Sequence, residues 1–140
     1  MEVDRDISEM FKIISEYIHK VGDAQLMEHG LTFSQARVLL LLSNNGGSMT
    51  QKEIEMKYLS SHAAIHGIIV RLREKGFVEY AVKDADKRQR EVMLTKLGED
   101  SVVSIESSIG GSLLNILSHE DFEDLKRILS QIVAAIKKSG

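Results

Sequence analysis

Two histidines form the residue pair best suited to chemistry in this sequence. His62 and His66 stand four residues apart on a predicted helix, a spacing that can direct two imidazoles at one metal ion. Two ligands do not make a site, and the sequence offers no third ligand nearby. The chain has no Cys, which excludes disulfides and thiolate metal sites. We therefore expect no metal and no other cofactor, and we expect the two rings to face outward.

Clustered carboxylates are the second arrangement that could do chemistry. Asp84 and Asp86 fall in a predicted turn, and Asp121, Glu123 and Asp124 fall at a predicted helix start. Solvation and the helix dipole account for acids at such positions. The sequence contains no glycine-rich phosphate loop, nucleophile elbow or metal triad. An enzyme is the least favoured interpretation.

Positive charge gathers in the middle of the chain. The net charge is −3, but residues 48–92 hold nine Lys and Arg against seven Asp and Glu, a net charge of +2. The remainder holds nine against fourteen, a net charge of −5. Because the distribution of charge matters more than the total, the central segment is compatible with a nucleic-acid partner.

Helical periodicity and capping residues predict the elements that would position these side chains. Thr32 with Gln35 and Thr50 with Glu53 match capping boxes, and Gly76 is a helix stop. We predict helices over about 5–28, 33–44, 51–58, from Ser60 or Ser61 to Lys75, about 96–117, and from Ser118 onward, with a hairpin of Phe77–Val82 and Arg90–Leu94. The fold class is mainly α with a small β-hairpin wing (α+β), a winged helix-turn-helix core with helical extensions.

Several short segments, in order and at matching spacing, resemble the MarR family of transcriptional regulators. They are Leu31-Thr32 with Gln35, Val38 and Leu39; Thr50-Gln51-Lys52-Glu53-Ile54; Leu72–Glu79; and Asp86-Lys87-Arg88 followed by Leu94-Thr95 and Gly98. The resemblance covers the whole chain and implies one domain, 1–140. Residues 32–95 would form the DNA-binding lobe, and residues 5–29 and 96–138 would form dimerisation helices. The three long amphipathic helices independently favour a homodimer, since the small core cannot cover all their apolar stripes.

The outward face of the helix over 60–75 is expected to enter the DNA major groove. We predict that the DNA-binding residues are Thr50, Gln51, Ser60, Ser61, His62, Ala63, His66, Gly67, Arg71, Arg73, Lys83, Asp86, Lys87, Arg88 and Arg90. The resemblance implies that Arg88 enters the minor groove and that Asp86 orients it. A solvated turn is the alternative for Lys83 and Lys87.

The chain also departs from the family pattern. The family often has a Thr-Arg pair where this chain has His66-Gly67, and often has Arg where it has Tyr80. Arg is the commonest reader of guanine, whereas Gly reads nothing. We therefore predict sparse base readout that depends on DNA shape and on the wing.

The predicted function is a DNA-binding transcriptional regulator, acting as a repressor on a pseudo-palindromic operator with half-sites about 10 base pairs apart. The resemblance implies a small-molecule effector pocket, for which Tyr17, His29 and Arg37 are candidates. The alternative is a winged-helix protein-protein interaction module that has lost DNA binding, favoured by Gly67 and Val70 on the outward helix face.

The expected location is the cytoplasm, with no membrane partner. The longest strongly apolar run, Val38–Leu42, is too short to span a bilayer, and the charged Met1–Asp6 segment is unlike a secretory signal.

Overall fold

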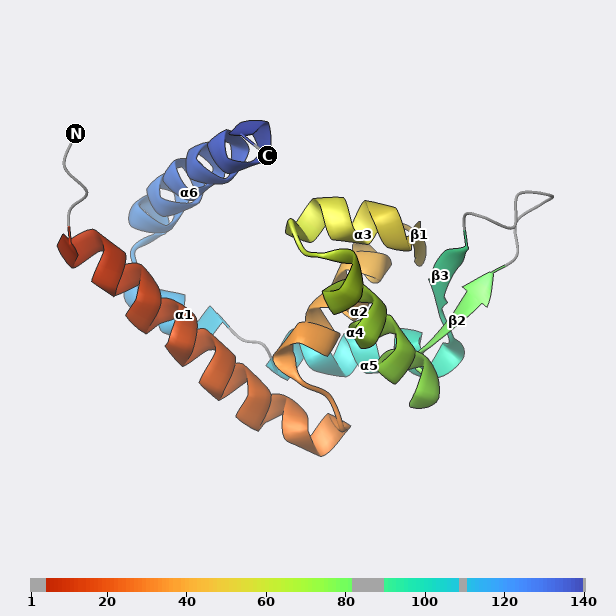
Figure 1. Ribbon diagram of the computed structural model, residues 1–140. Helices are drawn as coiled ribbons and strands as arrows, with labels where there is room; N and C mark the ends of the chain where they lie inside the picture. Colours follow the sequence, from red (N-terminus) through yellow and green to blue (C-terminus); the bar gives the residue numbers. More distant parts are fainter. Residues whose placement is uncertain (1–4, 82–89, 109–110, 140) are drawn as a thin grey trace. The chain divides into compact units, whose positions relative to one another are not determined.

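The computed structural model describes residues 5–81, 90–108 and 111–139 of the chain (Figure 1). Its elements are α1 (Arg5–Leu26), the 3-10 helix η1 (Met27–His29), α2 (Phe33–Asn44), β1 (Ser48–Thr50), α3 (Gln51–Tyr58), α4 (His62–Glu74), β2 (Val78–Ala81), β3 (Glu91–Leu94), α5 (Lys96–Ser108), the 3-10 helix η2 (Gly111–Ile116) and α6 (His119–Ser139). The chain forms two compact units, Met1–Ile109 and Gly110–Gly140. The predicted fold class is confirmed.

Hydroxyl side chains begin the helices as the sequence predicted. The Thr32 hydroxyl accepts from the Gln35 N–H, and the Gln35 side chain accepts from the Thr32 N–H, which completes a capping box. Ser61 rather than Ser60 caps α4, where its hydroxyl accepts from the Ala64 N–H at 3.1 Å. The hydroxyls of Thr50, Thr95 and Ser118 cap α3, α5 and α6 in the same way. Local sequence therefore determines where these helices start.

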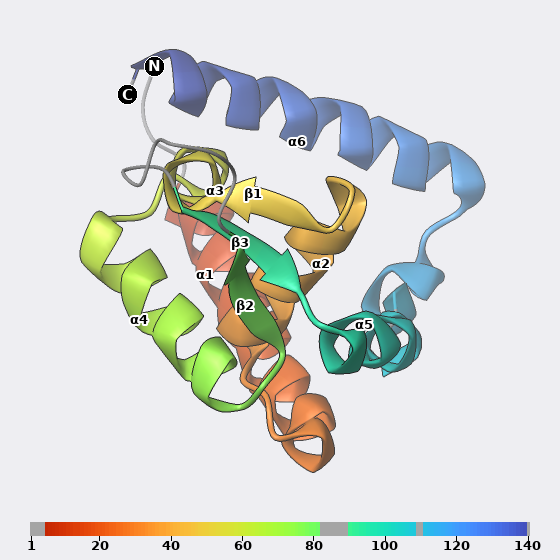
Figure 2. The same cartoon turned by 90° about the vertical axis from the view of Figure 1, so that its right-hand side faces the viewer.

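The three strands form one antiparallel sheet in the order β1-β3-β2 (Figure 2). The predicted hairpin is present as β2 and β3, with Tyr80 opposite Val92. Sequence reasoning missed β1, which is only three residues long and pairs with β3 so that Thr50 lies opposite Glu91. Because β1 runs directly into α3, this pairing places the start of α3 beside the wing strands.

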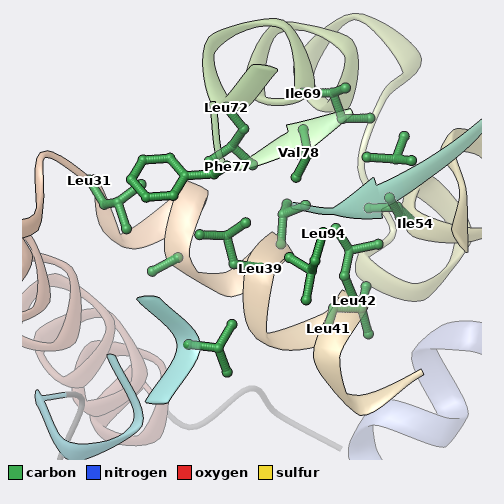
Figure 3. Packing of buried hydrophobic residues seen from close by; sticks show 14 of the residues in the cluster. Leu31, Leu39, Leu41, Leu42, Ile54, Ile69, Leu72, Phe77, Val78 and Leu94 are labelled. Atoms are coloured by element: carbon green, nitrogen blue, oxygen red, sulfur yellow. The ribbon is translucent and has the colours of Figure 1, made fainter. Parts of the chain in front are cut away.

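A single apolar core holds the winged lobe together. Side chains from α2, α3, α4, α5 and all three strands belong to it. Figure 3 shows Leu39 of α2, Ile54 of α3 and Ile69 of α4 packed with Val78 of β2 and Leu94 of β3. Leu39, Leu42, Ile54, Ile69 and Leu72 are completely inaccessible to solvent. Each such side chain contributes about 1.5–3 kcal/mol on burial, so this core is the main source of the lobe's stability.

Two features, one at each end, help to fix the position of α4. The turn between α3 and α4 contains Leu59 at φ 50°, a left-handed conformation that costs a non-glycine residue about 1–2 kcal/mol. At the other end of α4, the Lys75 ammonium donates to the Gly30 carbonyl at 2.6 Å and to the buried Gln35 side chain at 3.0 Å. The helix is thereby tied to the segment that opens α2.

The single helix expected over about 96–117 is wrong beyond Ser108. There α5 ends, and residues 111–116 form the 3-10 helix η2. In this stretch the sequence is Ser107-Ser108-Ile109-Gly110-Gly111. Each glycine costs a helix about 1 kcal/mol relative to alanine. Weak local propensity ended a helix that apolar periodicity alone would have continued.

The first and last helices leave their apolar stripes open. On α1 only Gly22 and Leu26 are buried, whereas Phe11 and Ile14 are each 48% exposed. No residue of α6 is buried. Over the described ranges, none of the helices has the length and apolar character needed to cross a bilayer.

Candidate nucleic-acid interface

Helix α4 has two sharply different faces. Ile65, Ile69 and Leu72 are buried in the core, and Ile68 packs against it. The outward-facing residues predicted from the sequence, Ser60, Ser61, His62, Ala63, His66 and Gly67, are all exposed. The helix thus follows α3 across a short turn and presents its N-terminal half to the outside, the arrangement of a helix-turn-helix.

Gly67 is not required by the packing of the described residues. A Cβ placed there would meet nothing within 4 Å. A glycine inside a helix costs about 1 kcal/mol relative to alanine, and its backbone angle here is one that any residue adopts. Gly67 therefore lowers stability while leaving open space at the middle of the outward face.

A hydrogen-bonded polar cluster joins α3 to the outward face of α4. We call Gln51, Glu55, His62 and His66 the α3–α4 cluster. The Gln51 amide nitrogen donates to the Glu55 carboxylate at 3.0 Å, and His62 Nδ1 lies 2.6 Å from the same carboxylate. His66 Nδ1 lies 3.4 Å from the Gln51 side-chain oxygen, and the two imidazoles stack with centroids 6.0 Å apart.

Glu55 is the member of this cluster that sequence reasoning missed. Its side chain is only 18% exposed. The hydrogen bond from Gln51 and the neighbouring His62 ring hold the pKa of Glu55 below its usual value, so the carboxylate is charged at neutral pH. The i, i+4 spacing from Gln51 was a signal that could have identified it.

The arginines on this side differ in how they are held. The Arg73 side chain donates to Glu79 at 2.9 Å and lies over the Tyr80 ring at 4.7 Å. This hydrogen bond lowers the pKa of Glu79. Arg90 lies 5.4 Å from the centre of the same ring. Arg71 is exposed and takes part in none of the ion pairs found among the described residues.

One surface hollow, with a volume of about 880 Å³, collects most of these groups. It is lined by Thr50, Gln51, Lys52, Glu53, Glu55, Met56, His62, His66, Tyr80 and Arg90. The structure therefore brings five predicted site residues from three parts of the sequence around one depression. Four others, Lys83, Asp86, Lys87 and Arg88, lie outside the described residues. Within the described chain, no group of three or more acidic or histidine side chains is arranged to hold a metal ion.

The three residues predicted to line an effector pocket do not gather at this hollow. Tyr17 is half-exposed on α1, and His29 is partly buried in η1. The Arg37 guanidinium lies 4.2 Å from the centre of the Tyr58 ring, and the Tyr58 hydroxyl donates to the Arg37 carbonyl at 2.6 Å. Burial raises the pKa of Tyr58. Arg37 thus contacts the last residue of α3, directly before the turn into α4.

Comparison with known proteins gives one family and many similar folds. Residues 29–89 match the family model described as "MarR family". The Staphylococcus aureus MepR–DNA complex shares 23% identity over 96% of this chain and 99% of that chain, with a TM-score of 0.81. AbsC, a MarR family transcriptional regulator from Streptomyces coelicolor, shares 17% identity over 99% of each chain, with a TM-score of 0.84. A MarR protein from Peptoclostridium difficile shares 17% over 98% and 91%, with a TM-score of 0.88. No curated protein sequence matches the chain.

Proposed function

We propose that the chain is a DNA-binding transcriptional regulator of the MarR family, whose model matches residues 29–89, and that it works as a homodimer. The observation that carries the proposal is the outward face of α4. That face is exposed while the opposite face is buried in the core. Arg71 and Arg73 lie in the last turn of the same helix, and Arg90 lines the hollow together with His66. Helix-turn-helix proteins place such a helix in the major groove and contact phosphates with the flanking cations.

The homodimer is supported by apolar surface that the described chain leaves open. Ile128, Ile132 and Ile136 on α6 are 41–51% exposed, and an apolar depression of about 490 Å³ lies between η2 and α6. Contiguous apolar surface of this kind marks an association site. A two-fold dimer would present two α4 helices to half-sites about 10 base pairs apart, so the operator should be pseudo-palindromic.

Repression and effector release complete the proposal. A dimer bound over a promoter would block transcription, and a ligand that favours a dimer with misspaced α4 helices would release it. Tyr17, His29 and Arg37 remain the candidate ligand contacts. The contact between Arg37 and Tyr58 supports this role for Arg37, since a ligand that moved the guanidinium would act on the end of α3. A screen of small molecules for release of labelled DNA from the wild-type protein tests this. Arg37→Ala should bind the DNA as tightly as wild type but should not release it when the active compound is added.

Fluorescence anisotropy with a pool of random duplex DNA, across a salt series, tests DNA binding. Wild type should bind with a steep salt dependence. Arg90→Ala should bind more weakly, with a log–log slope shallower by about 0.9 for each phosphate that Arg90 neutralises. Arg127→Ala is the matched control, because it removes the same charge from α6. If wild type fails to bind even at low salt, the proposal is wrong and the interaction-module alternative takes its place.

A further inference from the structure

We propose that Glu55 and Gln51 set the tautomer of His62 and His66, so that the neutral rings act as hydrogen-bond acceptors toward DNA bases. Such acceptors would select the amino group of adenine or of cytosine. The inference rests on the proposed DNA-binding function and names what the α3–α4 cluster reads. Gln51 and Glu55 are positioning residues in it, and the two histidines are the specificity-determining residues.

The first step concerns Gln51. The Glu55 carboxylate is ionised and can only accept hydrogen bonds. The Gln51 group that lies 3.0 Å from it must therefore be the amide nitrogen, which directs the amide oxygen elsewhere. That oxygen lies 3.4 Å from His66 Nδ1. Since an amide oxygen only accepts, the contact requires the proton of the His66 ring to be on Nδ1.

The second step concerns His62. Its Nδ1 lies 2.6 Å from the Glu55 carboxylate and 3.0 Å from the Gln51 amide nitrogen. The two contacts make opposite demands, because the carboxylate needs a donor and the amide nitrogen needs an acceptor. The carboxylate contact is shorter and charge-assisted, and Gln51 keeps its hydrogen bond to Glu55 without the ring. His62 therefore also carries its proton on Nδ1.

The consequence lies at Nε2. A neutral imidazole with its proton on Nδ1 has a lone pair on Nε2 and can only accept there. Among the described residues, neither Nε2 has a hydrogen-bond partner, and both rings are exposed and nearly parallel, 9° apart. In the major groove adenine N6 and cytosine N4 are donors, whereas guanine presents the acceptors N7 and O6. The neutral pair thus matches A or C and opposes G.

Operator selection from the random pool at about pH 8, with wild type, His66→Ala and Glu55→Gln, tests the inference. Every base pair carries one major-groove amino group, on adenine or on cytosine. Removing that group from the base pair whose preference is lost in His66→Ala, with purine in place of adenine or 2-pyrimidinone in place of cytosine, should cost wild type about tenfold in affinity. Glu55→Gln should lose this discrimination while it still binds duplex DNA, because a neutral amide can accept or donate and no longer sets the tautomer. Glu53→Gln removes the same charge from the exposed neighbouring position and should keep the discrimination.

Long-range ¹⁵N–¹H spectra of the histidine rings in the full-length free protein give a second readout. Both rings should show the Nδ1–H tautomer in wild type and in Glu53→Gln, and should lose it in Glu55→Gln. An Nε2–H tautomer in wild type, undiminished affinity for an operator that lacks this amino group, or unchanged discrimination in Glu55→Gln would each overturn the inference alone. Failure of wild type to bind any duplex would overturn the proposed function and, with it, the base readout.

Discussion

The winged lobe and helix α6 use the same apolar residue types in opposite ways. In the lobe, Leu39, Ile69 and Leu72 are completely buried. On α6, Leu129 is 38% exposed and Ile132 is 41% exposed, and no residue of the helix is buried. Periodicity along the sequence does not distinguish these cases, because both patterns repeat at helical spacing.

The difference shows which parts of the chain are stabilised by the chain itself. Lobe residues gain their burial free energy within one copy, so their contribution does not depend on protein concentration. The α6 stripe gains it only when another surface covers the stripe, and a contribution of that kind rises with protein concentration. The outward face of α4 is also open, but it is polar.

The largest expected effect separates the two regions directly. Leu39→Ala leaves a cavity in the core and should lower the free energy of unfolding by about 2–5 kcal/mol at every protein concentration. Leu129→Ala removes the same atoms from α6 and should act mainly by weakening self-association. Urea denaturation at several protein concentrations, with sedimentation velocity, measures both. An equal, concentration-independent loss in the two variants would show that the α6 stripe is covered within its own chain.

Gly98→Ala tests how tightly α5 packs against the backbone at the start of β2. A Cβ at Gly98 would lie 2.2 Å from the Phe77 carbonyl oxygen, a backbone atom that can move only with β2. The expected loss is about 1–3 kcal/mol of unfolding free energy, typical of overpacking. Thermal denaturation measures it, and a Gly98→Ala protein as stable as wild type would mean that α5 shifts freely against the strand.

Gly67→Ala applies the same change to the open face of α4 and should have the opposite sign. The added methyl group meets nothing in the described chain, so helix propensity should raise the free energy of unfolding by about 1 kcal/mol. DNA affinity, measured by anisotropy, should fall severalfold because the methyl group occupies space at the groove-facing surface. A gain in stability with unchanged DNA affinity would show that this face does not contact DNA.

The smallest effect is the pH dependence of the α3–α4 cluster. Because the folded pKa of Glu55 lies below its usual value of 4.5, its stabilising contribution is present above that pH and is lost as the pH falls through the folded value. The difference in unfolding free energy between wild type and Glu55→Gln should therefore shrink below about pH 4.5. Urea denaturation over a pH series checks this. A difference that grows in acid would contradict the assignment.

Much of the fold was predictable because its signals are local. Hydroxyl caps at Thr32, Ser61 and Thr95 begin helices through hydrogen bonds that span three residues, and the apolar face of α4 follows from spacing alone. β1 was not predictable, since three residues carry no periodicity and their pairing with β3 is a long-range contact. The early end of α5 was missed because periodicity was given more weight than two adjacent glycines.

For the candidate site, the sequence by itself determined which side chains lie on the outward face of α4, because a helical repeat assigns each residue to a face. Only the tertiary structure decided what those side chains meet. Glu55 is seven residues from His62 in the chain, and Gln51 is fifteen from His66, yet the crossing of α3 and α4 brings them into hydrogen-bond contact. Contacts between elements depend on how the helices pack around a shared core, which no local pattern encodes.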